Sequence, residues 1–356
     1  MKVALVGLLQ SGKSTLFASL SGKSAGAMGS ISIDEAIVPV PDERLEWLSE
    51  LYHPKKKVYA TIDCLDVPGF SFADEHGRAA ARRYIENIRT VELLVLVIRG
   101  FKNAAVPAYR NSVEPARDLK ELRTELLLAD LELVTTRIER LEKQIHKPTK
   151  THDHDKAELA LQKKLQEAIE EERPISSAVE SKAEEEMIKS LGFLTLKPMV
   201  VTVNVGEDEL DAEFDFSGEV GESAPVVGIC AKLEYELGQL DAESRAEFMA
   251  DLGITASAKS KFVNSCYSAL GLISFLTVVS GELRAWPIHK GTTALDAAGK
   301  VHTDIKRGFI RAETMAFGDL RELGSEKAVK SAGKSRLEGK EYIVQDGDII
   351  NFRFNV

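Results

Sequence analysis

Short, uniformly apolar runs alternate with longer amphipathic stretches along much of the chain. The runs 93–98, 199–203 and 226–230 contain no charged residues, as expected of parallel strands that helices cover on both faces. Residues 2–6 have a similar character and are followed by a glycine turn and a helical pattern over 13–20. Strands that alternate with helices in this way predict a doubly wound, mostly parallel α/β sheet.

A further strand is predicted over residues 58–67. The segment is rich in β-branched and apolar residues, and it ends at the turn-forming pair Pro68-Gly69. Because it follows the first strand and helix, we expect it to lie in the same sheet as residues 2–6.

Residues 118–191 differ from the sheet-forming parts because apolar side chains recur there at helical spacing. The pattern breaks at Lys147-Pro148-Thr149 and resumes over 157–169, which predicts a helical hairpin inserted between two strands. Such a hairpin is either a solvated structural arm or a surface for a partner, and the pattern leaves both open. The apolar positions of its first half are Leu119, Leu122, Leu126, Leu133, Ile138, Leu141 and Ile145.

From about Val278 onward the pattern changes to short strands punctuated by glycines. Strands are predicted over residues 284–288, 343–344 and 349–354. The segment is therefore predicted to form a small α+β module of about 80 residues.

Composition excludes several classes of protein. Hydrophobic residues make up 44% of the 356 residues and charged residues 29%, which is ordinary for a soluble globular protein. No apolar run reaches the length of a membrane span, and the apolar N-terminus is too short for a secretory signal, so we expect a cytoplasmic location. Cys64, Cys230 and Cys266 are odd in number and far apart, which argues against a disulfide framework.

The formal net charge of -10 argues against general nucleic-acid binding, and DNA is not expected as a partner. Residues 278–356 carry a slight excess of basic over acidic side chains. Contact of this last module with RNA therefore stays open, although charge alone does not indicate it.

The segment from Gly7 to Ser14 matches the phosphate-binding pattern GxxxxGK[ST], with a predicted strand before it and a helix after it. Glycines let the backbone curl until its N–H groups point at phosphate oxygens, and the helix N-terminus adds its dipole. Lys13 is expected to bridge the β- and γ-phosphates, and the Ser14 hydroxyl to bind Mg²⁺.

Asp66 ends the second predicted strand and is followed by Val67-Pro68-Gly69. A carboxylate at the end of a strand beside the phosphate loop is the usual outer-sphere partner of Mg²⁺. Gly69 is expected to let a backbone N–H approach the γ-phosphate.

The chain lacks the motif Asn-Lys-x-Asp, whose aspartate recognises the guanine edge in many phosphate-loop switches. The predicted strand 199–203 is followed instead by Asn204-Val205-Gly206-Glu207. A longer, displaced carboxylate is not expected to pair with guanine in the same way, and guanine selectivity is therefore not expected.

At this point the chain resembles the YchF family, an Obg-related branch of the phosphate-loop switch proteins with an NxxE base motif. The resemblance covers nearly the whole chain and is strongest at both ends. The segments that carry it are 7–14, 193–198, 204–207, 297–304, 308–312, 338–348 and 351–356.

The resemblance implies a nucleotide-binding domain over 1–117 and 197–277, an inserted helical arm over 118–196, and a ubiquitin-like β-grasp (TGS) domain over 278–356. It also implies ATP preferred over GTP, and association with ribosomes or ribosomal RNA. The nucleotide-binding residues that carry over are Gln10, Ser11, Gly12, Lys13, Ser14, Thr15, Gly69, Asn204, Glu207, Cys230 and Ala231. Cys230 is equally well interpreted as a small buried residue.

The chain departs from relatives where water would be activated. Phe70 stands where many switches have a water-orienting glutamine, and the family also has a hydrophobic residue there. Ala108 aligns with a histidine of relatives, and residues 79–83 favour helix where relatives are glycine-rich. The first switch segment, around 30–34, lacks the usual Mg²⁺-binding threonine, and Ser32 is the nearest substitute.

These observations predict a Mg²⁺-dependent ATPase switch in which Lys13 is the catalytic residue, Ser14, Asp66 and Ser32 hold the metal, and turnover is slow. Two alternatives of other classes stay open. One is a nucleotide-sensing adaptor with little or no hydrolysis, and the other is a protein that docks on ribosomes or RNA. His76 and the histidines at 146, 152 and 154 are interpreted as solvent-facing side chains and not as catalytic or metal-binding groups.

Overall fold

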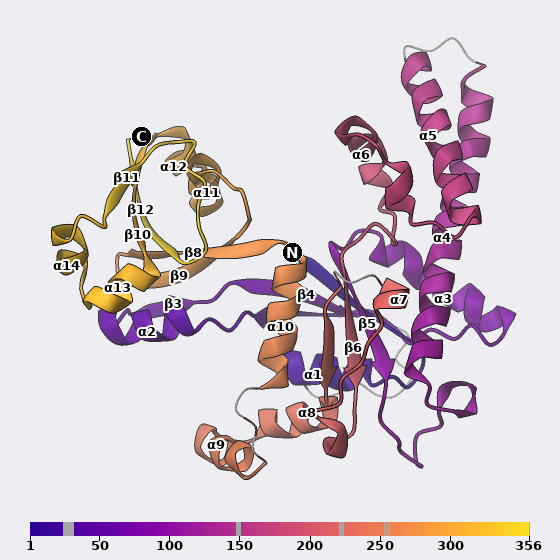
Figure 1. Cartoon of the computed structure of the whole chain (residues 1–356), viewed down its shortest axis with the longest axis horizontal. Coiled ribbons are helices and arrows are strands. Elements are labelled where there is room, and N and C mark those ends of the chain that lie inside the picture. Colours follow the sequence, from indigo (N-terminus) through magenta and orange to yellow (C-terminus); the bar gives the residue numbers. More distant parts are fainter. Residues whose placement is uncertain (24–31, 147–150, 221–223, 253, 255–256, 356) are drawn as a thin grey trace. The chain divides into compact units, whose positions relative to one another are not determined.

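The computed structural model describes residues 1–23, 32–146, 151–220, 224–252, 254 and 257–355 (Figure 1). The contacts between residues divide the chain into two compact units. The first combines Met1–Ala36 with Asp63–Lys259, and the second combines Ile37–Ile62 with Ser260–Val356.

The first unit is built on a six-stranded sheet with the order β2-β4-β1-β5-β6-β7. Strand β1 runs parallel to β4 and β5, β5 runs parallel to β6, and β6 runs parallel to β7. The doubly wound α/β sheet predicted from the apolar runs is therefore confirmed. The strands are β1 (Lys2–Val6), β2 (Asp34–Pro39), β4 (Thr61–Asp66), β5 (Leu93–Arg99), β6 (Met199–Asn204) and β7 (Val226–Ile229).

Helices cover the sheet and pack their apolar side chains against those of the strands, so that both form one hydrophobic core. Every residue of β5 is buried, as expected of a central parallel strand. The helices of this unit are α1 (Lys13–Ser21), α3 (Glu75–Ile88), α7 (Ser217–Val220), α8 (Ala231–Gln239) and α9 (Ala242–Asp251), with the short helices η1 (Tyr109–Asn111) and η4 (Glu207–Glu209). Helix α3 contains the alanine-rich residues 79–83, whose helical preference is thereby confirmed.

The predicted hairpin is formed by α4 (Pro115–Gln144) and α5 (His152–Glu170), which run side by side in Figure 1. The first turns of α4 pack against the sheet core through Leu119, Leu122 and Leu126. Its later turns contribute to a separate apolar cluster shared with α5. The predicted break at 147–149 lies outside the described residues. The arm is completed by η2 (Ile175–Ala178), α6 (Lys182–Ile188) and η3 (Lys189–Leu191).

Asp130 ties the base of this arm to the sheet. Its side chain is fully buried in α4, and one of its oxygens accepts from Arg89 Nη1 at 2.7 Å. The carboxylate also accepts from the backbone N–H groups of Leu194 and Thr195, at 3.1 and 2.9 Å. A buried carboxylate with a cationic partner and several donors is compensated for its loss of hydration.

We expect Asp130→Asn to lower the free energy of unfolding by about 2 kcal/mol, because the amide keeps the shape but loses the charge that balances Arg89. Urea denaturation measures this change. Asp153→Asn is the matched control, since Asp153 is exposed near the start of α5. Equal stability of the two variants would contradict the anchoring role of Asp130.

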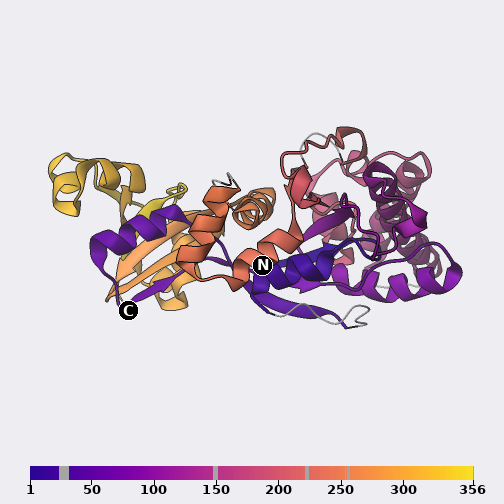
Figure 2. The ribbon, with the colours of Figure 1, turned by 90° about the horizontal axis from the view of Figure 1, so that it is seen from below.

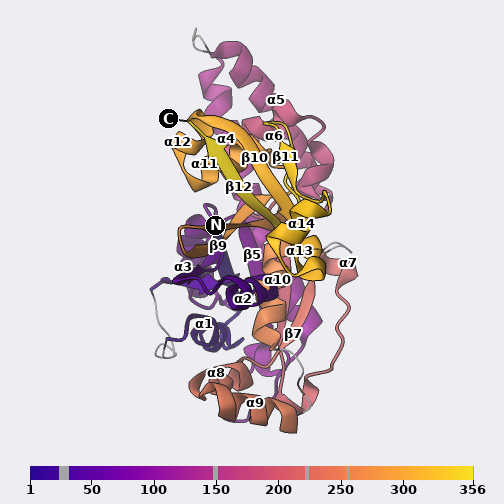
Figure 3. The same cartoon turned by 90° about the vertical axis from the view of Figure 1, so that its left-hand side faces the viewer.

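The second unit is a mixed sheet with the order β11-β10-β12-β8-β9-β3. Strands β8 and β12 are parallel, and the pairs β8–β9, β10–β12 and β10–β11 are antiparallel. Helix α2 contacts β9, and its purple ribbon lies beside the orange strands in Figure 2. Helix α12 contacts β12, and α11 contacts β9 and β10; Figure 3 labels these elements. A mixed sheet that carries helices agrees with the TGS-like fold implied by the resemblance.

The elements of this unit follow the chain in two stretches. Strand β3 (Lys56–Val58) and helix α2 (Glu43–Tyr52) belong to the first stretch. The second stretch contains α10 (Ala258–Ala269), which begins in the first unit, β8 (Leu272–Val279), β9 (Glu282–His289), α11 (Ala294–Val301), α12 (Thr303–Arg307), β10 (Phe309–Ala316), α13 (Phe317–Leu323), α14 (Glu326–Ser331), β11 (Arg336–Glu338) and β12 (Asp348–Phe354).

The structure corrects three predictions about segments. The strand expected over 58–67 is β4 and begins only at Thr61, whereas Val58 ends the separate strand β3; β4 pairs with β1 and β3 pairs with β9. Residues 37–62 therefore group with the second unit and not with a domain over 1–117. The boundary expected at 277/278 falls inside β8, whose pairing with β9 is continuous from Leu272 to Val279.

The expected strand at Ile343–Val344 is also absent. Ile343 forms only an isolated bridge with Thr293, since the chain turns again at Gly347 before β12 begins. Among the described helices, none has the combination of length and apolar character that a bilayer crossing requires.

Candidate functional site

Four segments meet at the carboxyl edge of the parallel sheet. Strand β1 leads into the loop 7–12, β4 ends at Asp66, β6 ends at Asn204, and β7 leads to Cys230. Because neighbouring parallel strands end on the same side, residues from four distant parts of the sequence are brought together there. This edge is the usual position of ligand sites in such sheets.

The phosphate loop has the backbone conformation that its glycines allow. Gly12 caps α1 with φ of 88°, and Gln10 also has a positive φ, of 60°. A Cβ atom on Gly12 would lie 2.0 Å from the Asn204 amide nitrogen, so no other residue fits there. Ser11 is buried, whereas Ser14 is exposed and Thr15 is half-buried.

Lys13 is the central charge of the site. Its side chain is 5% exposed, and its ammonium donates to the carbonyl oxygens of Gly7 and Leu8 at 3.2 and 3.3 Å. No carboxylate in the described part of the chain forms an ion pair with it. Burial lowers the pKa of Lys13 to about 8, and the charge of Asp66 only partly opposes that shift. The loop therefore holds a desolvated cation that an anion would stabilise.

The buried charge of Lys13 should cost stability in the absence of nucleotide. Its pKa of about 8 in the folded protein is below the ordinary 10.5, so the unfolded chain binds more protons between these two values. Stability attributable to this lysine therefore rises as the pH increases from 8 to 10.5. We expect Lys13→Met to raise the free energy of unfolding by about 2 kcal/mol at pH 7, with little gain at pH 10.5.

Urea denaturation of the nucleotide-free protein at both pH values measures this effect. Lys120→Met is the matched control, because Lys120 is exposed on α4 and should show no such gain. A less stable Lys13→Met variant at pH 7 would contradict the prediction.

Asp66 and Ser14 form a second polar pair beside Lys13. Burial raises the pKa of the Asp66 carboxyl, while a hydrogen bond with the Ser14 hydroxyl and the charge of Lys13 oppose this shift. Within the described residues, Asp66 Oδ1 is buried and has no hydrogen-bond partner. Hydroxyl and carboxylate oxygens of this kind are the ligands that Mg²⁺ prefers, so the residues fit that ion.

The segment after Asp66 lies directly on the phosphate loop. Leu9 N–H donates to Phe70 O at 2.8 Å, and Phe70 N–H donates to Gly7 O at 3.0 Å. A Cβ atom on Gly69 would lie 3.0 Å from Leu9 Cα, which explains the need for glycine at this close approach. The Phe70 ring is 1% exposed and contacts Phe72, so its side chain belongs to the core.

Asn204 connects the phosphate loop to the loop after β7. Its side chain is 5% exposed, its amide nitrogen donates to Ser11 O at 3.0 Å, and its amide oxygen accepts from Ala231 N–H at 3.0 Å. Both polar atoms are therefore used within the protein, and the residue positions the loops that surround the site.

Glu207 and Cys230 have different surroundings. Glu207 is exposed, and its carboxylate lies 2.8 Å from the ammonium of Lys232. Cys230 is buried just before α8, and burial raises the pKa of its thiol. The side chain of this cysteine is part of the core. The roles of both residues in reading a base stay predictions.

The remaining candidates lie outside this cluster or at the limits of the described chain. Ser32 is exposed just before β2, and its neighbours Ser30 and Ile31 lie outside the described residues. Ala108 is half-buried before η1, and His76 is exposed on α3. The part of the chain that the structure describes contains no cluster of histidine, cysteine and acidic side chains suited to a metal ion.

Sequence reasoning missed the residues that shape the loop after β5. Arg99 is buried at the end of that strand, and its guanidinium donates to the carbonyl oxygens of Phe101, Val106 and Pro107 at 2.9–3.1 Å. Tyr109 lies in the same loop and contacts the segment after Asp66. An arginine at the end of an otherwise apolar strand was the available signal, since such a charge must find partners.

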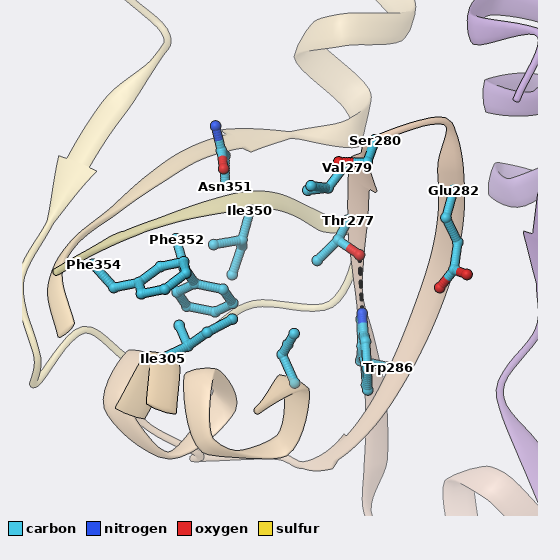
Figure 4. A pocket seen from close by; sticks show the side chains of 11 residues that line it. Thr277, Val279, Ser280, Glu282, Trp286, Ile305, Ile350, Asn351, Phe352 and Phe354 are labelled. Carbon is cyan, nitrogen blue, oxygen red and sulfur yellow. Dashed lines mark hydrogen bonds between the residues drawn. The ribbon is translucent and has the colours of Figure 1, made fainter. Parts of the chain in front are cut away.

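The second unit contains a separate cavity of about 430 Å³ (Figure 4). Aromatic side chains of Trp286, Phe352 and Phe354 line it together with Thr277 and Asn351. Trp286 Nε1 donates to Thr277 Oγ1 at 3.0 Å, which fixes the orientation of the indole ring. The residues that line the cavity include no cluster of reactive side chains.

Two family models match the chain. The model described as "50S ribosome-binding GTPase" matches residues 2–204. The YchF-GTPase_C model, whose description is "Protein of unknown function (DUF933)", matches residues 272–355. Together they include the phosphate loop and most of the second unit.

Full-length relatives are also similar. The "Ribosome-binding ATPase YchF" of Bacillus subtilis is 38% identical over 371 residues, which covers 100% of both chains. "Obg-like ATPase 1" of Oryza sativa subsp. japonica is 37% identical and covers 100% of this chain and 92% of its own. The solved "Structure of the Schizosaccharomyces pombe YchF GTPase" is 30% identical, with a TM-score of 0.82 over 99% of this chain and 97% of that one.

Proposed function

The chain belongs to the YchF family, and on that premise we propose that it is a Mg²⁺-dependent ATPase switch that associates with ribosomes. ATP is the preferred nucleotide and GTP binds less well. The names of its relatives, which include ribosome-binding ATPases, support this assignment. Ribosome association also supports a cytoplasmic location.

The observation that carries the proposal is the state of Lys13. Its ammonium is buried, its pKa is lowered to about 8, and its hydrogen-bond partners among the described residues are two loop carbonyls. Phosphate oxygens would be stronger partners for this charge. The backbone N–H groups from Gln10 to Thr15 and the N-terminus of α1 would surround the same anion.

A magnesium ion would be held by the Ser14 hydroxyl and, through water, by Asp66, with Ser32 as a further oxygen ligand. When bound, the ion supplies positive charge to the β- and γ-phosphates. The buried, unpartnered Asp66 Oδ1 supports this arrangement. Lys13 and the loop amides would stabilise the charge that develops during phosphoryl transfer.

ATP preference follows from the absence of Asn-Lys-x-Asp and from the position of Glu207. The exposed Glu207 carboxylate is paired with Lys232 and would have to leave that partner to contact a base. Asn204 acts mainly by positioning Ser11 and Ala231 around the nucleotide. The backbone at Cys230 and Ala231 would lie along the base.

Intrinsic turnover should be slow because neither of the two described positions at which related switches orient water, Phe70 and Ala108, has a side chain that can do so. Phe70 is buried in the core, and Ala108 has no polar group. The ribosome would then supply or order the missing group. A single-turnover assay with and without ribosomes tests this part, since an unchanged rate would contradict it.

Titration calorimetry with non-hydrolysable ATP and GTP analogues in Mg²⁺ tests the central proposal. We expect measurable binding of both and tighter binding of the ATP analogue. Absence of binding to either analogue would overturn the proposal, and equal or tighter binding of the GTP analogue would overturn the base preference.

One alternative has a specific observation in its favour. Phe70 and Ala108 offer no group to activate water, which favours a nucleotide-sensing adaptor that binds ATP and barely hydrolyses it. Tight ATP binding without turnover, in the presence and absence of ribosomes, would support the adaptor. Co-sedimentation with ribosomes over a salt series, with and without ATP, distinguishes both roles from a third one, docking on ribosomes that does not require nucleotide.

A further inference from the structure

Tyr109 forms a buried contact with the segment that approaches the γ-phosphate side of the site. Its hydroxyl accepts from the backbone N–H of Phe72 at 3.3 Å and donates to Glu121 Oε1 at 2.9 Å. Burial and the nearby Glu121 carboxylate raise the pKa of the phenol, so the hydroxyl keeps its proton. The hydroxyl therefore joins Phe72 to helix α4.

The loop that carries Tyr109 is held from several sides. Arg117 donates to the carbonyl oxygens of Tyr109 and Ser112 at 3.2 and 3.0 Å, and Arg110 forms two hydrogen bonds with Glu121 at 2.6 and 3.0 Å. Arg110 has φ of 49°, a left-handed conformation that arginine rarely adopts, and the next residue, Asn111, has φ of 64°, which asparagine tolerates better. Such a conformation persists only where the surroundings require it.

Tyr109 is therefore held in place by its own loop and by α4, and it contacts residues 69–72 through the Phe72 N–H. Residues 69–72 are held by the Phe70 backbone on the phosphate loop and by the Phe72 N–H on Tyr109. Because the Phe70 side chain is buried in the core, Phe70 can face the γ-phosphate only with the backbone that it contributes to this segment. Its position then determines how well a backbone N–H stabilises the transferred phosphoryl group.

We propose that Tyr109 is a positioning residue for ATP hydrolysis, whose hydroxyl holds residues 69–72 in place at the γ-phosphate side of the site. This inference rests on the proposed ATPase function. Without the hydroxyl, the buried Phe72 N–H loses its acceptor and the segment shifts to find another. Lys13 and the remainder of the phosphate loop do not contact Tyr109 by hydrogen bonds, so nucleotide affinity should be kept.

The test is Tyr109→Phe, which removes only the hydroxyl. We expect kcat to fall about 5- to 10-fold while the Kd for a non-hydrolysable ATP analogue stays within about twofold. Glu121→Gln keeps an oxygen that accepts from the Tyr109 hydroxyl but removes the negative charge, so the hydrogen bond is weaker. We expect this variant to lower kcat by about twofold. Tyr342→Phe is the matched control, because it removes a phenol hydroxyl that donates to Asp348 at 2.7 Å in the second unit.

Hydrogen exchange of the Phe72 amide in the nucleotide-free protein provides a readout independent of catalysis. We expect it to be at least about fivefold faster in Tyr109→Phe than in the wild type. Unchanged exchange, unchanged kcat, or a parallel loss of kcat, affinity and thermal stability would each overturn the inference. Failure of the proposed ATPase function has a different signature, because the wild-type protein would then bind neither the ATP analogue nor the GTP analogue.

Discussion

Replacing Lys13 by alanine is expected to lower ATP turnover about 10³-fold. The ammonium is the one charged side chain of the phosphate loop, and it is already buried and aligned by Gly7 and Leu8. Loss of a single preorganised donor at a developing charge costs about 10²- to 10³-fold, and a charged donor is at the upper end of this range. The variant should also bind ATP more weakly, because the ground-state phosphates lose the same partner.

Steady-state turnover and calorimetry measure the two effects separately. Lys120→Ala is the matched control, since it removes an exposed lysine of α4. In the wild type, ATP affinity should decrease above pH 8, where the free enzyme loses the Lys13 proton and binding must restore it. Turnover within about tenfold of the wild type in Lys13→Ala would contradict the assignment of this residue.

Asn204→Ala is expected to weaken binding of an ATP analogue about 100-fold. The substitution leaves Ser11 O without its donor and Ala231 N–H without its acceptor, both in buried positions. Each unpaired group costs about 1–3 kcal/mol, and the two loops are then no longer held in the arrangement that surrounds the nucleotide. The loss should appear in affinity, and turnover should fall as well, because the loop that contains Ser11 leads directly to Lys13.

Calorimetry with a non-hydrolysable ATP analogue measures this change. Thr202→Val is the matched control, because Thr202 is fully buried in the same strand and its hydroxyl has no hydrogen-bond partner among the described residues. The threonine variant should bind like the wild type. If Asn204→Ala binds ATP within about threefold of wild type, the connection between the loops is not what organises the site.

Much of the first unit could be predicted from the sequence because its signals are local. The apolar run 93–98 is long enough and uniform enough to specify a buried parallel strand, and β5 is buried throughout. The phosphate loop is contiguous, so its glycines, Lys13 and Ser14 were visible in one short motif. The place of Asp66 followed from the end of a strand and the turn after it.

Other features of the fold and of the site depend on contacts between segments that are far apart in the sequence. Local composition carries little information about which of these segments pair. Residues 56–58 are too short and too polar to indicate a partner, yet they form β3 beside β9. The role of Asn204 was also hidden, because a sequence motif does not tell whether an amide faces a base or joins two loops. Tyr109 carried no local signal, since its acceptor and donor groups belong to α4 and to the segment after β4.

The sequence by itself determined the phosphate loop motif, the parallel sheet, the helical arm and the expected roles of Lys13 and Ser14. These depend on spacing over a few residues, where backbone geometry and apolar periodicity act directly. Only the tertiary structure decided the pairing of residues 37–62 with the C-terminal unit and the contacts of Asn204 with Ser11 and Ala231. Such contacts join groups far apart along the chain, and the burial of the whole fold selects them.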